Sequence, residues 1–120
     1  MFDKIKNILT SLSDVKNLHL LQNLIEQLNK DFIMSGLDWY FDPKLNPKEL
    51  LGALQERIGE LLLKEPRLFS NLMYRIDISE MHLMQQKDHD FDKTRDKITL
   101  AILKREWQKV WFRNKNSPSV

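Results

Sequence analysis

The stretch from Phe91 to Arg113 constrains the fold more than any other part of this chain. It contains neither proline nor glycine, and it holds two of the three tryptophans. On a helix, steps of three and four residues create one apolar seam, and other apolar residues point to a second side. The seam comprises Leu100, Leu103, Trp107 and Val110, and the second side carries Ile98 and Ile102. A helix that is apolar on two sides is covered on two sides, so we predict an inner helix.

Helix-boundary signals divide the preceding chain. Gly36 follows an apolar, heptad-like run, at the place where a left-handed C-cap with Leu37 as its apolar partner is expected. The segment 46–49 combines a capping Asn, a proline at the first helical position and a capping-box Glu. Pro66 then ends that helix, because the residue before a proline avoids the α conformation. We expect helices at about 2–12, 14–35, 47–64, 66–76, 81–87 and 91–113.

No internal repeat and no extended strand alternation interrupts this pattern. A chain of 120 residues with 42% hydrophobic residues is long and apolar enough to bury a core without cross-links. We therefore predict an all-α, single-domain bundle of five to six helices, with the long C-terminal helix packed centrally. The domain is expected to span residues 1–113, and residues 114–120 are expected to form a flexible C-terminal tail.

Composition narrows the classes of function. The absence of cysteine excludes disulfides, thiolate metal sites and cysteine nucleophiles. No apolar run is long enough for a signal peptide or a membrane span, so we expect a cytoplasmic protein without a membrane partner. The net charge of +2 favours no particular partner.

The motif that most resembles a metal site is the acidic run 88–92, which places aspartates at alternate positions like the start of a calcium loop. The pattern fails where glycine and glutamate are required, because Lys93 and Thr99 stand there. The run is typical of the acidic first turn of a helix. His82 and His89 lack the spacing and the further ligands of a zinc site. Nucleophile elbows, phosphate-binding loops and zinc-protease motifs are absent. We expect no metal, no cofactor, no catalytic residue and no enzyme activity.

The C-terminal helix carries an uneven charge. Between Lys93 and Lys115, eight basic residues face two acidic ones, which leaves +6 (8 − 2) on this segment. Arg105, Lys109 and Arg113 follow one another at four-residue steps, and such clusters contact phosphates in nucleic-acid-binding proteins. Most helical charge runs are solvated faces or pair with neighbouring carboxylates, and this plainer interpretation is favoured here.

Two aromatic clusters are candidate partner-binding surfaces. Trp39, Tyr40 and Phe41 are consecutive in a segment that we expect to be a loop, and Trp111 and Phe112 lie near the end of the last helix. Aromatic side chains are enriched in binding surfaces, but they also close the ends of helical bundles.

These features support three hypotheses. The preferred one is a small protein-interaction or regulatory module without catalytic activity, acting on a protein partner or as a homodimer. The second is a nucleic-acid-binding protein that uses Arg105, Lys109 and Arg113. The third is a ligand carrier or enzyme whose pocket is lined by aromatic residues: Trp39, Tyr40, Trp107 and Trp111.

Overall fold

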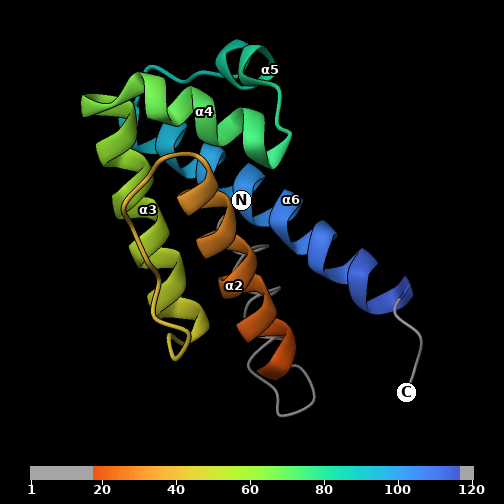
Figure 1. Cartoon of the computed structure of the whole chain (residues 1–120). Helices are drawn as coiled ribbons and strands as arrows, with labels where there is room; N and C mark the ends of the chain where they lie inside the picture. Colours follow the sequence, from red (N-terminus) through yellow and green to blue (C-terminus); the bar gives the residue numbers. More distant parts are fainter. Residues whose placement is uncertain (1–17, 117–120) are drawn as a thin grey trace.

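The computed structural model describes residues 18–116, and every regular element in this range is a helix (Figure 1). The expected opening helix around Phe2–Leu12 lies outside the described residues. The elements are α2 (Leu18–Met34), α3 (Pro47–Lys64), α4 (Pro66–Ile76), α5 (Glu80–Gln85) and α6 (Phe91–Asn116). The prediction of an all-α bundle is confirmed, and α6 extends beyond the expected end at Arg113.

The end of α2 is set by Gly36. Its φ of 91° is the left-handed conformation that glycine adopts without steric cost. Gly36 N donates to Ile33 O at 3.0 Å, and Leu37 N donates to Phe32 O at 3.0 Å. This pair of bonds is the Schellman motif, which satisfies carbonyl groups left free by the last helical turn. The chain then leaves α2 with Leu37 buried.

The start of α3 has the capping box expected from its sequence. Asn46 Oδ1 accepts from Glu49 N at 2.8 Å, and Glu49 Oε1 accepts from Asn46 N at 2.9 Å. Two short helices follow the break at Pro66. Asp77 ends α4 in the left-handed conformation, and Ser79 caps α5 by accepting from His82 N.

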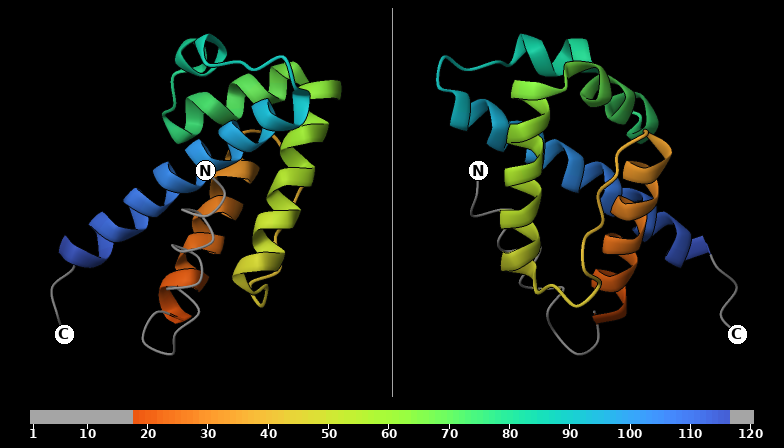
Figure 2. Two further views of the ribbon diagram at one scale, coloured as in Figure 1. Left: turned by 180° about the vertical axis from the view of Figure 1, so that it is seen from behind. Right: turned by 60° about the vertical axis from the view of Figure 1, so that its left-hand side comes forward.

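Helix α6 is central to the arrangement. It packs against α2, α3 and α4, whereas α5 rests mainly on α4. In the right-hand view of Figure 2, α6 crosses behind α3 and α2, and Figure 1 shows α4 and α5 over one end of the bundle. The predicted central position of the C-terminal helix is therefore confirmed. Every described helix is too short or too polar to cross a lipid bilayer.

The two apolar sides of α6 merge into one broad buried face. Ile98, Ile102, Leu103 and Val110 are all buried, while Leu100 and Trp107 at its border are half-buried. At about 100° per residue, position 106 falls between Ile102 and Val110, in the middle of this face. A glutamate occupies that position, and its exposed fraction is 0%. The carboxyl group of Glu106 therefore lies at the centre of the buried face of α6.

Candidate functional site

The first aromatic cluster is largely part of the core. In the irregular segment after α2, burial alternates along the chain: Leu37 and Phe41 are buried and Trp39 is half-buried, whereas the residues between them are exposed. Phe41 is buried, and its ring meets Phe32 edge-on with 5.1 Å between centroids. Asn29 fixes the backbone of Phe41 from both sides, donating to its carbonyl at 2.9 Å and accepting from its N–H at 2.7 Å. Trp39 is half-buried beneath the Arg57 guanidinium, which lies 4.9 Å from the ring centroid. Tyr40 points outward and is 63% exposed.

The second aromatic cluster lies on the C-terminal half of α6. Trp111 and Phe112 are both largely exposed, and Trp111 lies 6.1 Å from Trp107 between ring centroids. Within residues 18–116, no ring contact joins this cluster to Trp39 or Phe41. The structure therefore leaves Tyr40, Trp111 and Phe112 available for contact, on separate parts of the surface.

The three candidate cations of α6 do not act as one exposed row. Lys109 Nζ donates inward to Asp31 Oδ2 at 2.9 Å and to Glu106 Oε1 at 3.2 Å. Arg105 pairs with Asp77 at 3.3 Å. Arg113 lies at the edge of a cavity of about 250 Å³ between α2 and α6. With Lys109 committed to internal carboxylates, this row is a poor match to a phosphate backbone.

Lys109 belongs to a buried charge cluster that the sequence patterns did not reveal. Asp31 of α2 is 1% exposed and accepts three side-chain donors. Gln27 Nε2 and Lys109 Nζ reach its Oδ2 at 3.0 and 2.9 Å, and Arg75 Nε reaches its Oδ1 at 3.1 Å. Glu106 of α6 completes the cluster. The cluster therefore joins α2, α4 and α6 through polar bonds at their common contact.

The two carboxyl groups of the cluster have opposite pKa shifts. Burial, together with the hydrogen bond and negative charge of Asp31, raises the pKa of Glu106 to about 9 against the opposing effect of Lys109. Burial also acts to raise the pKa of Asp31, but the hydrogen bonds of Glu106, Gln27 and Lys109 outweigh it and lower that pKa. At neutral pH the pair therefore carries one negative charge and one proton, which resides on Glu106.

The atoms of Glu106 agree with this assignment. Its Oε1 accepts from Lys109, while its Oε2 is buried and finds no donor among the described residues. An oxygen without a donor is the one that a proton stabilises most. Neither Asp31 nor Glu106 lines either cavity described here. Both side chains are buried, and Lys109 of α6 links them by donating to Asp31 of α2 and to Glu106.

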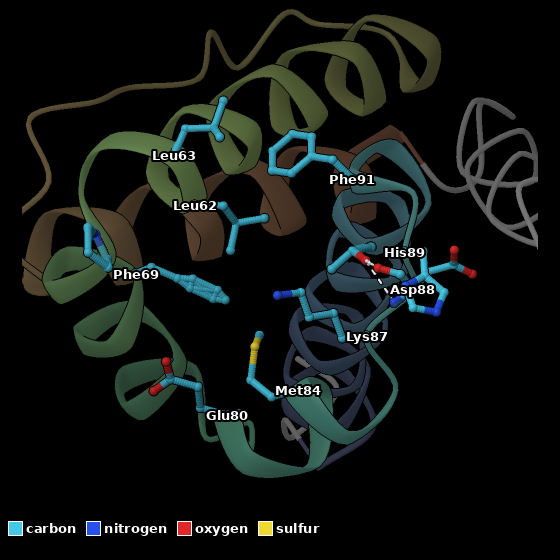
Figure 3. A pocket seen from close by; sticks show the side chains of 11 residues that line it. Leu62, Leu63, Phe69, Glu80, Met84, Lys87, Asp88, His89 and Phe91 are labelled. Atoms are coloured by element: carbon cyan, nitrogen blue, oxygen red, sulfur yellow. Dashed lines mark hydrogen bonds between the residues drawn. The ribbon is translucent and has the colours of Figure 1, made fainter.

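A different place on the molecule offers a surface for binding. A groove of about 500 Å³ lies between the end of α3, the first turn of α4, α5 and the start of α6 (Figure 3). We call it the α5 groove. Its apolar lining comes from Leu62, Leu63, Pro66, Phe69, Met84 and Phe91. Phe69 is buried at its floor, whereas Leu63, Met84 and Phe91 remain 68%, 38% and 39% exposed.

Polar residues form one edge of the α5 groove. The connector before α6 is closed by hydrogen bonds: Asp88 N donates to Thr94 Oγ1 at 2.9 Å, and Asp90 N donates to Asp88 Oδ1 at 2.9 Å. Hydrogen bonding to Asp90 N, the largest effect, lowers the pKa of Asp88, and the charges of Lys97 and Lys93 act in the same direction. The acidic run 88–92 therefore uses its carboxylates to shape the turn into α6, as the helix-start interpretation expects.

Neither cavity is lined by Trp39, Tyr40, Trp107 or Trp111, the residues of the aromatic-pocket hypothesis. The α5 groove was missed because its walls come from helix ends that are distant in sequence. Only weak sequence features point to the groove. Phe91 and Leu63 are apolar residues that lie outside the core-facing stripes of α6 and α3.

Comparison of the chain with protein-family models, with curated proteins and with solved structures found no match in any of the three.

Proposed function

We propose that this protein is a protein-interaction module without catalytic activity, and that the α5 groove receives the apolar side chains of a partner segment. The observation that carries the proposal is the groove itself: an apolar hollow of about 500 Å³ bordered by exposed Leu63, Met84 and Phe91. Apolar side chains that border a hollow gain free energy when a partner covers them. Methionine suits such a role, because its flexible thioether adapts to partners of different shape.

The surroundings of the groove favour a macromolecular partner over a small ligand. Met81 on α5 lies outside the hollow and is 73% exposed, and Leu63 at the rim is 68% exposed. A small ligand would leave these side chains in water, whereas a partner segment crossing the groove covers them. The absence of cysteine in the chain suits a reducing compartment, and the cytoplasm remains part of the proposal.

The test begins with a display library of random short peptides selected on the folded protein. We expect the enriched peptides to carry at least two large apolar residues, because the groove has apolar lining from four elements. Leu63→Gln and Met84→Gln should each weaken a selected peptide by about tenfold, since both side chains border the hollow. Titration calorimetry measures this loss.

Met34→Gln is the matched control. Met34 is 62% exposed at the end of α2 and does not line the groove. The proposal is refuted if Met34→Gln weakens the selected peptides as much as Leu63→Gln and Met84→Gln do. It is also refuted if the library yields no enriched peptide. Sedimentation at micromolar concentration adds a separate outcome: a dimer that Leu63→Gln dissociates would make a second copy of this chain the partner.

A further inference from the structure

Lys87 holds an unusual position in the α5 groove. It lies in the connector that follows α5, and Figure 3 shows its ammonium group projecting over the hollow between Phe69 and Met84. No ion pair or side-chain hydrogen bond joins Lys87 to any other residue of the described range. Its ammonium group therefore stands beside an apolar floor without a partner in that range.

The acidic residues at the same groove are already engaged. Glu80 Oε1 accepts from Ser70 Oγ at 2.9 Å. Asp88 accepts from Asp90 N, and its Oδ2 lies 3.8 Å from Lys97 Nζ. The remaining titratable residue in the lining, His89, adds no negative charge. Glu80 keeps its negative charge, because a hydroxyl donor does not neutralise a carboxylate, and Asp88 is paired with Lys97. Among the charged side chains of the lining, Lys87 is thus the one whose polar group has no partner in the described residues.

We propose that the α5 groove selects partner segments that place an acidic side chain beside their apolar anchors, so that the carboxylate meets Lys87. This inference rests on the proposed function and names the chemistry of its partner. The physical reason is desolvation: a segment that covers the floor also removes water from the ammonium group, and only an acidic side chain replaces that water fully. A neutral segment leaves the ammonium unpaired, and a basic segment repels it.

The experiment compares selections from one random peptide library on three proteins: the wild type, Lys87→Gln and Lys48→Gln. Lys48 is exposed in the first turn of α3, at the opposite end of that helix from Leu63, and it does not line the groove. Its substitution removes the same charge from the chain. We expect Asp and Glu to be enriched on the wild type and on Lys48→Gln, and this enrichment to disappear on Lys87→Gln.

The affinities of single peptides then test whether the preference for acidic residues depends on Lys87. Lys87→Gln should weaken an enriched acidic peptide by about fivefold, which is the upper range for a partly exposed ion pair. The same peptide with Asn or Gln in place of its acidic residue should bind the wild type and Lys87→Gln with affinities within about twofold of each other. Added salt should narrow the difference between the acidic and neutral peptides.

The possible outcomes distinguish the role of Lys87 from the proposed function of the α5 groove. Apolar peptides enriched without acidic residues, or an equal effect of Lys48→Gln, would refute the role of Lys87 and leave the proposed function standing. A library without binders would refute both. In that case dodecanoate is the remaining probe: binding that Lys87→Gln weakens would identify a site for small amphiphilic carboxylates in place of a protein partner.

Discussion

At the residue scale, the interior of the protein contains a pair of carboxyl groups, Glu106 and Asp31, which differ in protonation. A carboxyl group in the middle of the buried face of α6 is held neutral by its surroundings, while Asp31 keeps its charge among three donors. Sequence patterns did not predict this arrangement. In the sequence, Glu106 is one of the two acidic residues that oppose the eight basic ones between Lys93 and Lys115. Helical periodicity shows that it shares a face with Ile102 and Val110, but not which partner α2 supplies.

The pH dependence of stability follows from Glu106. Its pKa in the folded protein, about 9, lies above its ordinary value of 4.5, so its stabilising contribution is complete below pH 4.5 and declines as the pH rises to 9. The free energy of unfolding should fall by up to about 1.4 kcal/mol per pH unit in this window. Glu106→Gln, which resembles the protonated acid, should abolish the decline.

Urea unfolding monitored by circular dichroism between pH 5 and 9 checks this prediction. Glu56→Gln is the control, because Glu56 is exposed on α3 and its substitution should leave the decline unchanged. The assignment of the proton to Glu106 fails if Glu106→Gln retains the slope of the wild type.

Arg105 and Lys109, which lie four residues apart on α6, should contribute very differently to the free energy of unfolding. Lys109→Met leaves the carboxylate of Asp31 without one of its donors in a buried site, and we expect a loss of about 3 kcal/mol. Arg105→Met removes only a pair with Asp77, whose side chain is 85% exposed, and should cost less than about 1 kcal/mol. Chemical unfolding at neutral pH compares the two variants, and equal losses would contradict the buried role of Lys109.

At the element scale, local signals were the most reliable predictors. The capping box at Asn46 and the C-cap at Gly36 were both predicted, because each depends on a few consecutive residues whose backbone conformation their side chains determine. The acidic turn before α6 was also interpreted as a helix start. The sequence was less informative about Trp39 and Phe41, since a loop residue turns inward only when another element, here α2 with Asn29, provides a place for it.

The two glycines inside α3 provide a matched test at this scale. A Cβ atom at Gly52 would meet nothing within 4 Å, whereas one at Gly59 would lie 3.3 Å from Cδ of Arg95. Gly52→Ala should therefore raise the free energy of unfolding by about 0.5–1 kcal/mol through helix propensity. Gly59→Ala should gain less, because Arg95 must shift while it pairs with Asp92 and Asp96. Thermal unfolding distinguishes the two, and an equal gain would contradict the close approach at Gly59.

At the scale of the whole molecule, the buried cluster and the α5 groove occupy different places. The cluster lies where α2, α4 and α6 meet, and the groove lies where helix ends and α5 come together. The fold class and the central position of α6 were predicted from apolar periodicity. The groove was not, because periodicity describes one helix at a time and the groove exists only where α3, α4, α5 and α6 are assembled.

The separation of groove and core predicts different effects for two leucines of α3. Leu61 is fully buried, and Leu61→Ala should cost about 3 kcal/mol. Leu63 is 68% exposed at the groove, and Leu63→Ala should change stability by less than about 0.5 kcal/mol while it weakens partner peptides. Urea unfolding combined with calorimetric titration checks both effects. A large loss of stability in Leu63→Ala would show that the groove wall is part of the core.

Helix α5 contributes Leu83 to the core and otherwise rests mainly on α4. Most of its surface is therefore free to vary in the course of evolution, since few of its side chains are needed to keep the bundle folded. Related chains can be expected to diverge most along this short segment. Exchanging it together with the connector that carries Lys87 should transfer partner preference from one protein to another.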